Sequence, residues 1–264
     1  MQLKRRVALN GVWLDSVDNR IVVSGIEPAD GRENISAVDA ASGYGQRITG
    51  HRRSTLDMVV RFSIFENGKS VTGMQNRAEV LEKVNAWASP GGLLTVNYKP
   101  GRQLRVVLAQ APGEGSLWDY TKEFQITFRA YAIPYWEDSA PDSTKVGSDG
   151  TSGSKSVLFG GSADTQTDVE LKNMGSSTAN AVTVTVDGKT MTFSSLGLVA
   201  GESLIIDHVD GLVRIRIKNG STYRSAMDKR SGANDLIASP GSRACSYTAD
   251  QNCRMTVNWR SRYL

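Results

Sequence analysis

The chain has 264 residues, of which 39% are hydrophobic and 22% charged, and its formal net charge is +4. These values are typical of globular proteins, so they exclude a globally disordered chain. The length suits about two domains, each able to bury a core of its own. Lys and Arg are spread along the sequence without long runs, so no dedicated nucleic-acid surface is predicted.

The N-terminal residues Met1–Arg6 are followed by no apolar stretch, so we expect no secretory signal. No segment approaches the roughly 18 apolar residues of a membrane helix, so we expect a soluble protein without a membrane partner.

Alternation of apolar and polar residues predicts strands throughout the first half. The strongest candidate is Leu56–Ile64, with five apolar residues at alternate positions, and Phe124–Ala132 repeats the pattern. Shorter candidates are Gly11–Leu14, Arg20–Ser24, Leu93–Tyr98 and Leu104–Ala109.

One segment departs from this alternation. Met74–Ala88 has apolar residues at spacings of three and four, which predicts an amphipathic helix. Ser89-Pro90-Gly91-Gly92 ends it, because Pro cannot continue a helix. Residues 1–137 are therefore predicted to form a β domain with one packed helix.

The composition changes in residues 138–156, where Ser, Gly, Asp and Thr dominate and Val146 is the only large aliphatic residue. Such a segment buries too little apolar surface to offset its ordering entropy. We therefore predict a linker or a long exposed loop between two domains.

Short strands return in residues 157–264, separated by turn signals such as Asp187-Gly188 and Asn219-Gly220. This spacing predicts a β-sandwich or jelly roll. The predicted strands are Val157–Phe159, Asp168–Leu171, Val182–Val186, Met191–Phe193, Ser203–Ile206, Leu212–Ile217 and Met255–Trp259.

A search for catalytic residues finds no signature. His51 and His208 are interpreted as turn or surface residues, and no nucleophile-elbow motif occurs. Gly113-Glu114-Gly115-Ser116 lies between two predicted strands, so it is interpreted as a hairpin tip rather than a phosphate loop. We predict that the protein is not an enzyme.

The two cysteines, Cys245 and Cys253, lack nearby ligands that would complete a metal site, so no metal and no other cofactor is predicted. They are either two ordinary thiols or a pair that faces across a β-hairpin and oxidises after assembly.

Two short motifs resemble those of phage distal tail proteins (the Dit family). The strand Glu123–Ala132 runs into Ile133-Pro134-Tyr135-Trp136-Glu137, similar to a Pro-Tyr-aromatic motif where the family's first domain meets its second. The chain end Val257–Leu264 is similar to the family's closing Arg-x-Arg-aromatic-Leu strand, and Asn234–Ile237 with Pro240-Gly241 resembles the approach to it.

The resemblance implies a mainly β fold, with an N-terminal tail-tube-like domain that has one α-helix and a hairpin, and a C-terminal galectin-like β-sandwich. In some relatives the last strand returns to the first domain. It also implies a homohexameric ring of the siphophage virion tail, made in the host bacterial cytoplasm. The ring joins the tail tube to the tip or baseplate hub and supports host attachment.

The implied partners are further copies of the chain, the tail tube protein, a tail-tip or tail-associated protein and a receptor-binding protein. DNA would only pass through the ring opening. We predict the inter-subunit surface in the helix and in the hairpin near residues 111–119. Its residues are Met74, Leu81, Trp87, Gly113, Glu114, Gly115 and Trp118.

Two other functions stay open. The second domain would be a carbohydrate-binding module for host surface glycans, with Tyr223, Tyr247, Trp259 and Tyr263 available for stacking. A second aromatic group, Trp118, Tyr120, Tyr135 and Trp136, favours core or interface packing over a sugar platform. A wall-degrading hydrolase is the third hypothesis, and we do not expect it.

Overall fold

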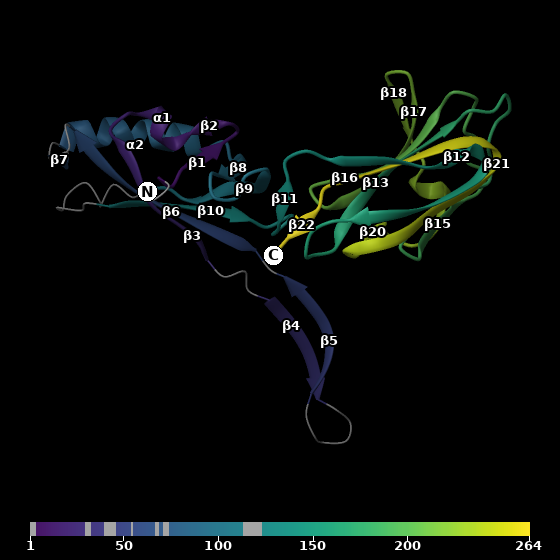
Figure 1. The fold of residues 1–264 in the computed structure, drawn as a ribbon, viewed down its shortest axis with the longest axis horizontal. Coiled ribbons are helices and arrows are strands. Elements are labelled where there is room, and N and C mark those ends of the chain that lie inside the picture. Colours follow the sequence, from purple (N-terminus) through teal and green to yellow (C-terminus); the bar gives the residue numbers. More distant parts are fainter. Residues whose placement is uncertain are drawn as a thin grey trace. The chain divides into compact units, whose positions relative to one another are not determined.

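A computed structural model describes residues 4–29, 33–39, 46–53, 55–66, 69–70, 74–112 and 123–264. The chain divides into two compact units, Met1–Trp136 and Glu137–Leu264, so the division falls one residue before the predicted end of the first domain. Both units consist mainly of strands (Figure 1), as predicted for the fold class. The described residues include no helix long and apolar enough to cross a membrane.

The first unit contains one antiparallel sheet in which strands distant in sequence lie side by side (Figure 1). Apolar residues on one face of neighbouring strands align, so that Phe62 lies opposite Phe124 and their rings stack at 5.6 Å. In spatial order the strands are β2 (Val12–Trp13), β1 (Val7–Leu9), β8 (Gly92–Val96), β9 (Arg102–Gln110), β10 (Phe124–Ala130), β6 (Leu56–Glu66) and β3 (Ile21–Ala29), with β7 (Lys69–Ser70) beside β6.

The predicted helix is confirmed as α2 (Met74–Ala88). Its apolar stripe is buried, including Val80 and Val84 at 0% exposure, as are the alternate residues of β6 and β10. Trp87 packs edge-on against Phe128 of β10, with ring centroids 5.8 Å apart. The core of the first unit thus lies between α2 and one face of the sheet. A one-turn helix, α1 (Leu14–Val17), follows β2.

A separate two-stranded sheet, which sequence patterns did not predict, consists of β4 (Glu33–Asp39) and β5 (Gln46–Arg53). Among the described residues, neither strand has a second pairing partner. His51, interpreted from the sequence as a turn or surface residue, lies within β5 opposite Ile35, so it is not part of a turn.

The second unit is one curled antiparallel sheet. Its spatial order is β18 (Thr222–Ser225), β17 (Leu212–Asn219), β16 (Ser203–Val209), β13 (Thr165–Asn173), β21 (Gly241–Trp259), β14 (Val182–Val186), β15 (Lys189–Phe193) and β19 (Arg230–Gly232). β12 (Asp142–Phe159) and β20 (Ile237–Ala238) also belong to this sheet, and Met227–Lys229 forms a short 3-10 turn. β11 (Trp136–Asp138) and β22 (Arg262–Tyr263) pair with each other and are not part of it.

The long strand β21 connects the two halves of this sheet. Its later part pairs with β13, where Val257 lies opposite Val169, and its earlier part pairs with β14, where Tyr247 lies opposite Val184. Apolar residues from both halves belong to a single buried cluster. The sheet therefore curls around one core, which corresponds to the two-layered packing expected of a sandwich.

The predicted linker over residues 138–156 is wrong. Most of it belongs to β12, which pairs with β21 over nearly its whole length. The small residues of β12 make room for Tyr247: a Cβ at Gly153 would lie 2.6 Å from Cε1 of that ring and 2.9 Å from the carbonyl oxygen of Val146. The Tyr247 hydroxyl donates to the carbonyl oxygen of Cys253 at 2.7 Å. Backbone pairing with β21 and close packing against Tyr247 therefore stabilise this strand, although it contains few apolar residues.

The last long strand, β21, belongs to the second unit. The final strand β22 pairs with β11, whose residues Trp136–Asp138 span the division between the units, and both strands are grouped with the sheet that contains β9. Arg262 donates from Nε to Oε1 of Glu137 at 2.9 Å, and both side chains are largely buried.

Candidate functional site

The predicted inter-subunit residues fall into two groups. Gly113, Glu114, Gly115 and Trp118 lie outside the described residues. Met74 begins α2. Leu81 is 5% exposed, and the Trp87 indole donates to the Val12 carbonyl oxygen at 2.9 Å. The described contacts of Leu81 and Trp87 therefore attach α2 to its own unit.

An ionic cluster joins the polar face of α2 to the turn before β3. Asp18 accepts hydrogen bonds from the guanidinium of Arg20 at 2.9 and 2.8 Å and from Lys83 at 3.2 Å. Lys83 also pairs with Glu79 at 2.8 Å. The hydrogen bonds from Arg20 hold the pKa of Asp18 well below its usual range. All four residues of this cluster belong to the first unit.

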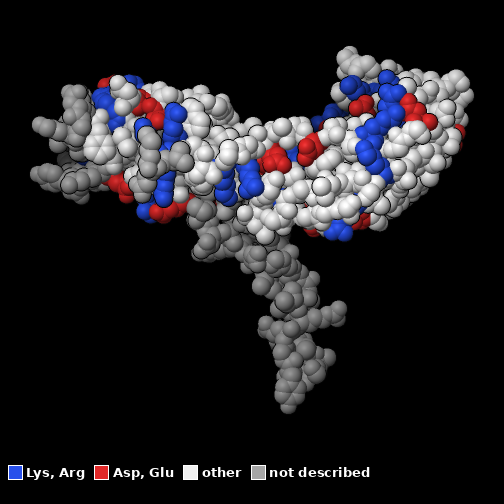
Figure 2. Space-filling view, in the orientation of Figure 1, with Lys and Arg blue, Asp and Glu red and all other residues white. Residues whose placement is uncertain are grey.

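The sheet face opposite α2 carries both ion pairs and exposed apolar side chains. Arg129 forms a bidentate pair with Asp57 at 2.7 Å, and Arg61 pairs with Glu27 at 3.1 Å. Tyr131, which continues the outward alternation of β10, is 59% exposed. Figure 2 shows acidic and basic groups interspersed on the visible face of each unit. Tyr and Arg are among the residue types that are enriched at protein interfaces.

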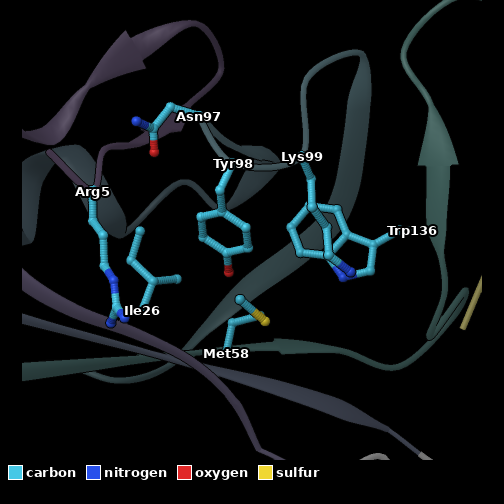
Figure 3. A pocket seen from close by; sticks show the side chains of 7 residues that line it. All are labelled: Arg5, Ile26, Met58, Asn97, Tyr98, Lys99 and Trp136. Atoms are coloured by element: carbon cyan, nitrogen blue, oxygen red, sulfur yellow. The ribbon is translucent and has the colours of Figure 1, made fainter. Parts of the chain in front are cut away.

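The first unit also contains a pocket of about 380 Å³, shown in Figure 3. Its lining comes from the chain start, β3, β6, the turn after β8 and the start of β11. Sequence reasoning missed this pocket because its residues are scattered along the chain. The only indication was the Pro-Tyr-aromatic motif, whose Trp136 forms part of the wall.

His208 is not a turn or surface residue, so that interpretation is wrong. It lies in β16 with a side chain that is 7% exposed. Nδ1 is 2.8 Å from a carboxylate oxygen of Asp168, and Nε2 is 2.7 Å from one of Asp235. Burial alone would lower the pKa of His208, but these two hydrogen bonds raise it to about 9. Both ring nitrogens are occupied, so neither is available to activate a nucleophile.

The alternative in which Cys245 and Cys253 face each other is wrong, since both lie in β21. Both are free thiols in the structure. Both are buried, and burial raises the pKa of each thiol to about 11. They are structural thiols.

Two of the four aromatic residues considered for sugar stacking in the second unit lie in the core. Tyr247 is 2% exposed and Trp259 is 8% exposed. Tyr223 is 49% exposed, and the Arg216 guanidinium lies 4.2 Å from its ring centroid. Within the described part of the chain, no three His, Cys, Asp or Glu side chains are grouped in a way that would hold a metal ion.

The architecture defines a mainly β protein with two sheet-based units, and the comparisons with known proteins identify the fold more closely. No protein-family model and no curated sequence matches the chain significantly. Among solved structures, it is similar to the Dit protein of phage SPP1, described as a paradigm of the hub adsorption apparatus in phages that infect Gram-positive bacteria. The TM-score is 0.70 at 16% identity, covering 98% of this chain and 99% of that one.

The baseplate of phage P2 in its activated conformation matches less closely. The chain from the structure with Ca has a TM-score of 0.46 at 9% identity, over 98% of both chains. The form with Sr has a TM-score of 0.44 at 9% identity, over 97% of both chains. The SPP1 comparison confirms the predicted resemblance at the level of fold: this chain has the fold of a phage distal tail protein.

Proposed function

We propose that the chain is a non-enzymatic structural component of a long-tailed phage tail tip. Six copies form a ring that joins the tail tube to the tip or baseplate and supports the components that adsorb to the host. The observation that supports this most is the full-length similarity to SPP1 Dit, at a TM-score of 0.70. The second unit would then be the galectin-like domain on the outside of the ring.

The β4–β5 sheet supports assembly with further copies. An isolated two-stranded sheet is marginally stable in water, and edge strands present unpaired backbone groups. Among the described residues, these two strands pair only with each other. Pairing or packing against a neighbouring copy would stabilise them, and cyclic symmetry would close the assembly.

The proposed contact surface between copies combines predicted interface residues with one surface found in the structure. Met74, Gly113, Glu114, Gly115 and Trp118 remain candidates beside the mixed sheet face that includes Tyr131. The other partners are the tail tube protein, a tail-tip protein and a receptor-binding protein. The protein would be located in the virion tail.

The ring is tested by multi-angle light scattering of the purified chain, alone and mixed with the adjoining tail proteins. We expect a mass of six copies in at least one setting. Tyr131→Asp should shift the distribution toward monomers, because it places a charge on the exposed sheet face. Leu212→Asp, at a residue 75% exposed in the second unit, is the matched control. A strict monomer in both settings would contradict the ring.

A carbohydrate-binding function is the second candidate, and Tyr223 is the observation that favours it. Its exposed ring lies next to Arg216, and aromatic rings beside polar groups stack on sugars. A glycan array with the folded chain tests this function. Binding that disappears in Tyr223→Ala would support it, and an empty array would exclude it.

A further inference from the structure

We propose that the pocket of the first unit binds a segment of another protein that presents a large apolar side chain beside a carboxylate. This inference goes beyond the ring, because it depends on the pocket alone and holds whether or not six copies assemble.

The floor and walls of the pocket are apolar and already in place. Met58, Trp136 and Ile26 are 0%, 2% and 5% exposed. Tyr98 contributes one side of its ring and remains 45% exposed at the opening. A volume of 380 Å³ is within the range of ligand pockets and holds one large side chain with its neighbouring backbone.

The charges around this apolar lining are basic. Arg5 lies at one side in Figure 3, and Lys99 lies at the other with Nζ 4.9 Å from the Trp136 ring centroid. Among the residues that line the pocket, none is acidic. Burial raises the pKa of Tyr98, and Arg5 partly opposes that effect, so the phenol is a neutral hydrogen-bond donor near pH 7. All three groups favour an anion.

Asn97 fixes the two basic segments relative to each other before any ligand arrives. Its Oδ1 accepts from the Arg6 backbone N–H at 2.9 Å, and its Nδ2 donates to the Lys4 carbonyl oxygen at 2.6 Å. The Asn97 backbone N–H also donates to the Arg6 carbonyl oxygen at 3.1 Å. These bonds hold Arg5 beside Tyr98 and Lys99.

A second pair of hydrogen bonds holds the turn after β8. The N–H of Lys99 donates to the Val96 carbonyl oxygen at 3.2 Å, and that of Arg102 to the Lys99 carbonyl oxygen at 3.3 Å. A site fixed in this way loses little conformational entropy on binding.

The combination favours a protein segment as the occupant. Protein interfaces are anchored by a large side chain that fills a preformed pocket, while charged groups pair at its rim. Here the apolar floor accepts the anchor, and the cations at the rim accept the neighbouring carboxylate.

Photo-crosslinking tests the proposal on the full chain in any oligomeric state. The probe is the blocked peptide acetyl-Gly-Bpa-Glu-Gly-amide, in which Bpa is benzoylphenylalanine, at a concentration below saturation. Mass spectrometry should locate the adducts on Met58 or Tyr98. The Gln version of the probe should give about tenfold less adduct, because it lacks the charge that pairs with the rim.

Substitutions of Arg5 and Lys99 test whether these two cations cause the preference for the Glu probe. Arg5→Gln and Lys99→Gln should each reduce the adduct from the Glu probe, whereas Lys189→Gln, the same charge change at an exposed residue of β15, should not. Circular dichroism checks that all variants fold.

Three results would each overturn the proposal. They are adducts scattered over the surface, equal yields from the Glu and Gln probes, and an undiminished yield in both single variants, Arg5→Gln and Lys99→Gln. Stronger competition by octanoate than by acetyl-Gly-Phe-Glu-Gly-amide would also overturn it, and would indicate a free fatty acid as the ligand.

Discussion

At the scale of single residues, His208 shows how tertiary contacts decide the properties of a side chain. Its two carboxylate partners are distant in the chain, 40 residues away for Asp168 and 27 for Asp235. Asp235 also accepts from Gln166 at 3.1 Å, and Gln166 accepts from Arg262 at 2.9 Å. No local pattern around His208 indicates this network, so its burial was not predictable from the sequence.

The same network predicts a pH dependence of the stability of the second unit. The pKa of His208 is raised from 6.5 to about 9 in the folded chain, so the protonated ring stabilises the fold. This stabilisation is fully present below pH 6.5 and is lost as the pH rises through about 9. We expect the free energy of unfolding to fall by up to about 3 kcal/mol across this interval.

Urea unfolding at pH 6 and pH 9 measures this change. His208→Gln should be less stable than the wild type at pH 6 and should lose less stability between the two pH values. An equal pH dependence in both proteins would assign the loss to other groups.

At the scale of elements, a strong period in the apolar residues was sufficient to predict a strand or helix from the sequence. The alternation in Leu56–Ile64 and the helical stripe in Met74–Ala88 correspond to β6 and α2. Composition failed in β12, where the neighbouring strand supplies the pairing and Tyr247 supplies the packing. The Gly- and Ser-rich segment β12 is thus a strand, and its small residues leave room for the Tyr247 ring of its partner.

Glycine substitutions in β12 test this explanation. Gly153→Ala should destabilise the second unit by about 1–3 kcal/mol, because the new Cβ would overlap the Tyr247 ring and a backbone oxygen. Gly150→Ala is the matched control, since its Cβ would meet its nearest atom at 3.5 Å, an ordinary contact. Thermal unfolding measures both. Equal losses would show that close packing on Tyr247 is not the reason for small residues here.

At the scale of the whole molecule, the two units have separate hydrophobic cores. The buried cluster of the second unit draws only on residues after position 137. We therefore expect a fragment of residues 137–264 to fold alone and to unfold in one cooperative transition. Circular dichroism during heating measures this, and a fragment without a transition would show that the first unit is needed.

The division into two units was predictable, because the pattern of strands with one helix differs from the later pattern of short strands. The pocket and the curled sheet were not, because both depend on which distant segments become neighbours. β6 and β10, for example, lie side by side although α2, β8 and β9 lie between them in the sequence.

The central place of β21 also has a consequence for synthesis on the ribosome. β12, β13 and β14 all pair with this strand, yet they precede it by many residues. While translation proceeds, these three strands are exposed without their common partner, and pairings between distant segments form slowly. The second unit completes its core only after residue 259 has left the exit tunnel. Slower elongation over the preceding codons would therefore prolong the period in which the nascent chain is exposed to aggregation and to chaperones.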